Sequence, residues 1–147
     1  MKATHKMFIL LVGLVTFFFN SSNTQACTCG ETTVSEQREN ASVVFLGTVT
    51  RKVRSNTVER DGVQVTFKVT RVWKGDASRE IVIYTGPTSD LYPFENLCAP
   101  PFKVGARYVV FAVREDKLET DVCAGTLLAT QARTAIQTLG PGKNIRR

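Results

Sequence analysis

Four cysteines constrain the fold of this 147-residue chain more than any other feature. Two of them form the triplet Cys27-Thr28-Cys29, and the other two, Cys98 and Cys123, stand far away in the sequence. An even number of cysteines in an exported chain predicts two disulfides. A bond between Cys27 and Cys29 would close a strained ring, so each is expected to reach a different distant partner. The sequence leaves both crossed pairings open.

A zinc site built from four thiolates is the alternative use of these cysteines. It fits poorly, because structural zinc sites usually carry two C-x-x-C pairs, and here one C-x-C is followed by two isolated cysteines. Two disulfides would instead close loops of about 70 to 95 residues, and the chain-entropy model assigns each such loop roughly 4 kcal/mol of stabilisation.

The first 26 residues have the layout of a signal peptide. Lys2 and Lys6 precede an apolar stretch over residues 7–19, polar residues follow, and the small Ala26 stands at the expected cut. At 1.5 Å per helical residue, 13 residues are too few to cross a hydrocarbon core about 30 Å thick. The prefix therefore predicts a secreted or periplasmic protein with no membrane span.

Lipoprotein processing is the alternative fate of this prefix. A lipid anchor on Cys27 would require a different peptidase, which usually needs an apolar residue at the position that Thr24 occupies. Simple cleavage after Ala26 is therefore the expectation.

Removal of residues 1–26 leaves 121 residues, enough for one modest domain. It also removes the single histidine, His5, and leaves 17 basic and 13 acidic side chains. Without histidine, catalysis by a Cys/His or Ser/His/Asp set is excluded, and we expect neither an enzyme nor a bound cofactor. The basic residues are scattered, which is compatible with anionic polymers but is no indication of nucleic-acid binding.

Most of the remaining chain has the periodicity of strands. Apolar Val63, Val65, Phe67, Val69 and Trp73 alternate with polar residues, which predicts a strand with one buried face. Strands are expected over residues 41–50, 63–73, 80–85, 107–114 and 117–123. The loop between the first two, residues 51–62, is expected to be short and polar.

Two helices are expected to flank the strands. Residues 33–40 open with Thr33-x-x-Glu36, a capping-box pattern, and residues 127–139 carry apolar side chains at helical spacing before Gly140-Pro141. Residues 141–147 are expected to form a solvated basic tail. Five short strands with two helices predict an all-β fold, best satisfied by a small barrel, although periodicity alone also permits a sandwich.

Several of these motifs together carry a resemblance to a known family. These motifs are the start Cys27-Thr28-Cys29-Gly30, the segment ASVVFLGTVT over residues 41–50, the strand end RVWKG over residues 71–75 and the spacings of Cys98 and Cys123. Together they are similar to the N-terminal domain of the tissue inhibitors of metalloproteinases and their single-domain relatives. The resemblance implies a five-stranded, OB-fold-like Greek-key barrel over residues 27–140. It also implies disulfides from Cys27 to Cys98 and from Cys29 to Cys123.

The resemblance implies inhibition of zinc metalloendopeptidases as well. In that family the free α-amino group and the carbonyl oxygen of the first cysteine, here Cys27, chelate the zinc of the protease and displace its water. The short side chain of Thr28 would enter the protease pocket beside the scissile position. The rest of the contact surface would come from Cys29, Gly30, Asn96, Leu97, Cys98 and Ala99, the last four in the loop over residues 95–100.

A second function is compatible with the same barrel. A netrin-like extracellular module would dock proteins or anionic glycans and would need no free amino terminus. The expected short loop over residues 51–62 limits any extended contact there. The chain also has four cysteines where the vertebrate inhibitor domain has six, so the helix over residues 33–40 is expected to be less tethered.

Overall fold

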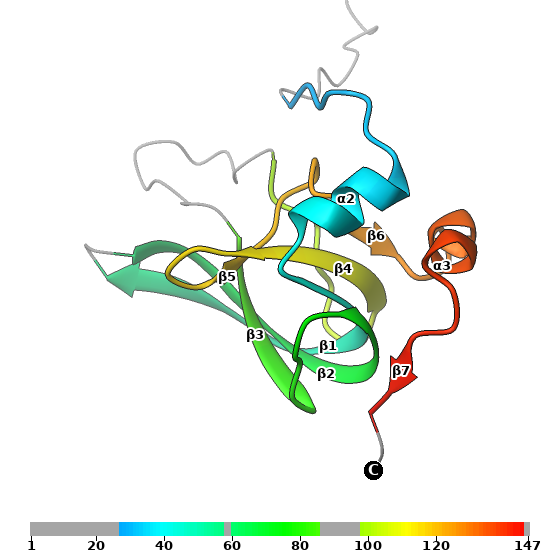
Figure 1. Ribbon diagram of the computed structural model, residues 1–147. Coiled ribbons are helices and arrows are strands. Elements are labelled where there is room, and N and C mark those ends of the chain that lie inside the picture. Colours follow the sequence, from blue (N-terminus) through cyan, green and yellow to red (C-terminus); the bar gives the residue numbers. More distant parts are fainter. Residues whose placement is uncertain (1–26, 58–59, 86–97, 146–147) are drawn as a thin grey trace, which may run out of the picture.

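The computed structural model describes residues 27–57, 60–85 and 98–145, and Figure 1 shows their arrangement. The described chain is rich in β-structure, with one helix before the strands and one after most of them. Its elements are α2 (Val34–Asn40), β1 (Val43–Thr57), β2 (Arg60–Lys74), β3 (Glu80–Thr85), β4 (Arg107–Arg114), β5 (Leu118–Glu119), β6 (Leu127–Leu128), α3 (Arg133–Leu139) and β7 (Lys143–Asn144).

The strands form a closed barrel. The sheet runs in the order β1-β2-β3-β5-β4-β6, and a further antiparallel pairing of β1 with β4 closes it. The pairing of β3 with β5 is parallel, and the other pairings are antiparallel. The five-stranded barrel β1-β2-β3-β5-β4 confirms the expected all-β, OB-like fold and resolves the choice between barrel and sandwich.

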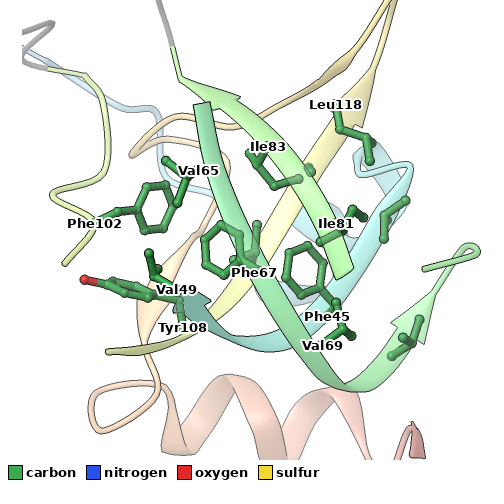
Figure 2. Packing of buried hydrophobic residues seen from close by; sticks show 14 residues of the cluster. Phe45, Val49, Val65, Phe67, Val69, Ile81, Ile83, Phe102, Tyr108 and Leu118 are labelled. Carbon is green, nitrogen blue, oxygen red and sulfur yellow. The ribbon is translucent and has the colours of Figure 1, made fainter. Parts of the chain in front are cut away.

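Aromatic rings fill the inside of the barrel (Figure 2). Phe67 on β2 lies at the centre, with edge-on contacts to Phe45, Phe102 and Tyr108 at ring-centroid distances of 5.4, 5.2 and 6.4 Å. Such edge-to-face pairs add to the stabilisation that burial provides. Val49, Val65 and Ile83 close the remaining space, so the barrel is a filled core.

A second apolar cluster covers the outside of β1 and β4. Val44 and Leu46 on β1 and Val109 and Phe111 on β4 pack there in one cluster with the buried Ala135 and Leu139 of α3. Helix α2 contributes the partly buried Val34. These strand residues alternate with others that face the barrel interior, so both faces of the paired segments are buried. This explains why the segments read as nearly continuous apolar runs.

Trp73 lies in a different layer from the one its alternation predicted. We expected it on the same face as Phe67, but it belongs to the outer cluster, whereas its neighbour Val72 belongs to the barrel core. The reason is irregular pairing with β1, in which Thr70 and Trp73 have no register partner. Each bulge inserts one residue and reverses the faces that follow.

The expected short loop over residues 51–62 is wrong. Strands β1 and β2 continue as a paired hairpin through this region, with register partners from Arg51–Thr66 to Thr57–Arg60. The sequence there is polar because both faces of the described part of β1 beyond Thr50 are exposed, from Arg51 to Arg54. Polar alternation on a two-sided exposed hairpin cannot be told from a loop by hydrophobic periodicity.

The fifth predicted strand is shorter than expected. Only Leu118–Glu119 are paired, and the chain turns at residues 122–125. The carboxylate of Asp121 accepts a hydrogen bond of 2.8 Å from the backbone N–H of Ala124. Asp side chains that bond forward in this way favour turns over strands, so the strand over residues 117–123 ends early.

The C-terminal helix also starts later than predicted. Leu127–Leu128 form strand β6 beside β4, and α3 covers only Arg133–Leu139. The predicted helix at residues 33–40 is confirmed as α2, with Thr33 as its N-cap. Leu128 packs on the barrel core and Ile136 on the outer cluster. Their helical spacing in the sequence therefore does not come from one face of a single helix.

Residues 143–144 in the expected tail are exposed, but their backbone pairs with β2 as strand β7. The approach is anchored by Trp73, whose indole N–H donates a 2.8 Å hydrogen bond to the carbonyl of Gly140. Gly142 has a positive φ of 63°, and a Cβ there would lie 2.8 Å from the indole nitrogen. Glycine is therefore required for the chain to pass over this ring.

A matched pair of valine substitutions tests the assignment of the barrel interior. Val65→Ala is expected to lower the free energy of unfolding by about 2 kcal/mol, because Val65 is 0% exposed and the smaller residue leaves a cavity. Val82→Ala, on the adjacent strand but 38% exposed, should change it by less than about 0.5 kcal/mol. Chemical denaturation measures both, and equal losses would contradict the assignment.

Candidate functional site

The N-terminal segment, residues 27–32, has no regular secondary structure and lies at the same end of the barrel as α2 (Figure 1). Cys27 is half-buried, and Thr28, Cys29 and Gly30 are exposed. A Cβ added at Gly30 would meet no atom within 4 Å. The first four described residues thus form a strip of chain that is half-buried at Cys27 and exposed from Thr28 to Gly30.

Two residues of this strip, Cys27 and Cys29, are bound covalently to distant loops. Cys27 is bonded to Cys98, with 5.5 Å between their Cα atoms, and Cys29 is bonded to Cys123, with 5.2 Å. These are the pairings that the family resemblance implied. Because only Thr28 separates the two bonded cysteines, the strip has little freedom to turn about either anchor.

The two loops that receive these disulfides are also joined to each other. The backbone N–H of Val122 donates a 2.8 Å hydrogen bond to the carbonyl of Cys98. The strip therefore sits on a single composite support. We call residues 27–30, 98–99 and 121–125 together the N-terminal ridge.

The loop that carries Cys98 is fixed on the barrel by two aromatic residues. Phe102 is buried in the barrel core at 3% exposure. The hydroxyl of Tyr108 accepts a hydrogen bond from the backbone N–H of Lys103 and donates one to the carbonyl of Pro101, at 3.0 and 3.2 Å. The chain that follows Cys98 and Ala99 is thereby anchored to Tyr108 on β4.

The loop that carries Cys123 is fixed by two buried threonines. The hydroxyl of Thr120 donates a 2.6 Å hydrogen bond to the carbonyl of Phe111, and the hydroxyl of Thr126 accepts one of 3.1 Å from the N–H of the same residue. The two hydroxyls lie 2.8 Å apart and bond to each other. Both ends of the loop thus attach to one residue of β4, and their polar groups are satisfied in the interior.

The residue after the N-terminal segment, Thr33, begins α2 with a capping box. Its hydroxyl accepts a hydrogen bond from the N–H of Glu36, and the Glu36 carboxylate accepts a 2.7 Å bond from the N–H of Thr33. That backbone bond, and then the bond from the Thr33 hydroxyl, holds the pKa of Glu36 below its ordinary value of 4.5. The helix start is therefore a defined attachment for the segment.

Of the predicted contact residues, the structure joins Cys27 to Cys98, and the half-buried Ala99 follows Cys98 in the chain. Thr28, Cys29 and Gly30 follow Cys27 in the chain, and Cys29 is bonded to Cys123. Asn96 and Leu97, and the signal peptide predicted over residues 1–26, lie outside the described residues. The sequence analysis did not predict that residues 121–125 join the ridge. The turn-forming Asp121 and the position of Cys123 were both signals for it.

Among the described residues, no group of three or more His, Cys, Asp or Glu side chains is placed to hold a metal ion. Within the same ranges, no helix combines the length and apolar character needed to cross a membrane. The two disulfides are compatible with an extracellular protein. Comparison with known protein families and with curated proteins gave no match to this chain.

The capping box predicts a pH-dependent helix start. Because the pKa of Glu36 is lowered in the folded protein, its stabilising effect is present above pH 4.5 and is lost as the pH falls through the lowered value. In a titration from pH 7 to pH 2 followed by NMR, the amide of Thr33 should shift with a midpoint below 4.5. Glu36→Gln should abolish this shift, and a wild-type midpoint at or above 4.5 would contradict the capping geometry.

Proposed function

We propose that this protein is an exported inhibitor of zinc metalloendopeptidases that acts through the α-amino group and carbonyl oxygen of Cys27. The observation that carries the proposal is the strip over residues 27–30, half-buried at Cys27 and exposed after it, which the disulfides fix to the loops that carry Cys98 and Cys123. Export and removal of residues 1–26 belong to the proposal, because only cleavage makes Cys27 the first residue.

The chemistry follows from what a zinc protease leaves open. Its metal is held by three side chains and keeps a water in the fourth position. A neutral amine and a carbonyl oxygen from the same residue can replace that water as a chelating pair. An α-amino group has an ordinary pKa of about 7.7 to 8.0, so binding to the metal near neutral pH requires loss of only one weakly held proton.

The disulfide of Cys27 has two consequences for this mechanism. Its sulfur is bonded to Cys98 and is therefore not a thiolate that could compete for the metal. The bond also fixes the residue whose backbone is proposed to bind. Ordering a flexible chain end on association costs about 0.5–1.5 kcal/mol per immobilised side chain, in addition to backbone entropy, and pre-formed anchoring reduces this cost.

Thr28 is placed to set selectivity under this proposal. It is exposed and lies between two cysteines that are both covalently anchored. A short side chain held in this way would enter the pocket next to the zinc with little loss of freedom.

The decisive test is to extend the chain by one residue. The protein beginning at Cys27, verified by intact mass and peptide mapping of both disulfides, should inhibit at least one zinc endopeptidase in a panel. One Ala added before Cys27 should reduce inhibition by about a hundredfold or more, because the amine is displaced and becomes an amide.

The matched control carries the extra Ala after Arg147 and should inhibit as the parent does. If the N-terminally extended protein kept its affinity, the chelation mechanism would be wrong. If the parent inhibited no member of the panel, the inhibitor function itself would be rejected.

A specific surface supports the second candidate, a module that binds anionic glycans. Arg51, Lys52 and Arg54 are exposed on the hairpin part of β1, and their register partners on β2 are Thr66, Val65 and Val63. None of these partners is acidic, and the ion pair found within the described ranges is elsewhere, between Lys117 and Glu119. Three exposed cations whose described register partners carry no negative charge favour attraction of a polyanion.

Replacement of these three cations by alanine should weaken binding to a sulfated glycan about tenfold and reduce its dependence on salt. The matched control, Lys103→Ala with Arg107→Ala and Arg133→Ala, removes three exposed cations away from the hairpin. Affinity chromatography over a salt gradient compares the two proteins. Equal retention of both variants would show that the hairpin makes no specific contribution.

A further inference from the structure

The side chain of Gln37, on α2, lies between the N-terminal segment and the loop over residues 121–125. Its amide nitrogen donates a 3.0 Å hydrogen bond to the hydroxyl of Thr32. Its carboxamide also covers Gly125, close enough that a Cβ on that glycine would overlap it. One half-buried side chain thus touches both the N-terminal segment and the loop over residues 121–125. Thr32 stands three residues from Cys29, and Gly125 stands two from Cys123.

The absence of a side chain at Gly125 leaves the space that the carboxamide of Gln37 occupies. It is buried and has a positive φ of 93°, a conformation that other residues rarely adopt. Any larger residue would also displace Gln37 and with it the donor to Thr32. The glycine therefore serves both the backbone turn and the close approach of the carboxamide.

The contact matters because of what else holds this stretch of chain. From Cys29 the segment passes through Gly30 and Glu31, both exposed, before the capping box begins at Thr33. Gly30 is the residue with the greatest backbone freedom. Within the described residues, the bond from Gln37 to Thr32 is the hydrogen bond closest to these two positions on the helix side of the disulfide.

We propose that Gln37 is a positioning residue that holds the N-terminal segment in its binding conformation and thereby sets the affinity of the inhibitory strip. This inference rests on the inhibitor function proposed above. Gln37 itself touches neither the strip nor, in the mechanism, the zinc. It acts through the hydroxyl of Thr32 on one side and the path of residues 121–125 on the other.

Two substitutions remove the contact from opposite ends. Gln37→Met keeps the length and the packing over Gly125 but has no donor, and Thr32→Val keeps the shape but has no acceptor. Each should raise the inhibition constant about three- to tenfold, the range expected for loss of one hydrogen bond. The double variant should raise the inhibition constant no more than the single variant with the larger effect, since both substitutions remove the same bond.

The control is Gln137→Met, the same change at an exposed position on α3. It should leave the inhibition constant unchanged. All four variants should melt within about 2 °C of the parent, because one exposed hydrogen bond contributes little to global stability. NMR relaxation should distinguish positioning from a general structural effect: the backbone order parameters of residues 28–32 should fall in Gln37→Met and Thr32→Val, and not in Gln137→Met.

An unchanged inhibition constant in Gln37→Met would overturn the proposal, whether or not the order parameters fall. Unchanged order parameters would overturn it as well, because the segment would then be held without Gln37. The relaxation measurement needs no protease, so the positioning role can fail or stand separately from the inhibitor function. That function is tested by the parent protein and its Ala-extended form.

Discussion

The pairing of β1 with β4 is the constraint on which the rest of the structure depends. It closes the barrel around Phe67 and its neighbours, and it also creates an outer surface of Val44, Leu46, Val109 and Phe111 that must be covered. Helices α2 and α3 are both too short to be stable alone, and they form where this surface receives them. The start of α2, and hence the course of the N-terminal segment, is thereby positioned by the closure of the barrel.

Strand β4 also holds the two loops that support the proposed site. The backbone of Phe111 is held by Thr120 and Thr126 at the two ends of one loop, and the hydroxyl of Tyr108 holds the other loop. The disulfides then connect an irregular chain end to these two loops. Strand β4 therefore fixes the two loops through hydrogen bonds, and the disulfides fix residues 27–30 to those loops. The proposed backbone chelation requires a chain end that is held in this way.

Several elements of the fold were predictable because a local signal coincided with the tertiary one. The capping box of Thr33 and Glu36 predicted the start of α2, and the apolar runs at residues 80–85 and 107–114 predicted β3 and β4 with their observed bounds. The long hairpin was not predictable, because Arg51 to Arg54 face water on both sides and carry no period-two signal. Strand β6 was missed because Leu128 and Ile136 are spaced as in a helix but pack on different clusters.

The sequence by itself determined that the chain is β-rich, that four cysteines would stabilise it in pairs, and that the triplet at residues 27–29 would be tied to distant positions. These properties depend on composition and short-range pattern, which any conformation of the chain retains. Only the tertiary structure decided that residues 121–125 join the ridge, that Trp73 leaves the barrel core at a bulge, and that Gln37 rests on Gly125. Such contacts join positions tens of residues apart, and their geometry is set when the barrel closes and both faces of β1 and β4 are buried.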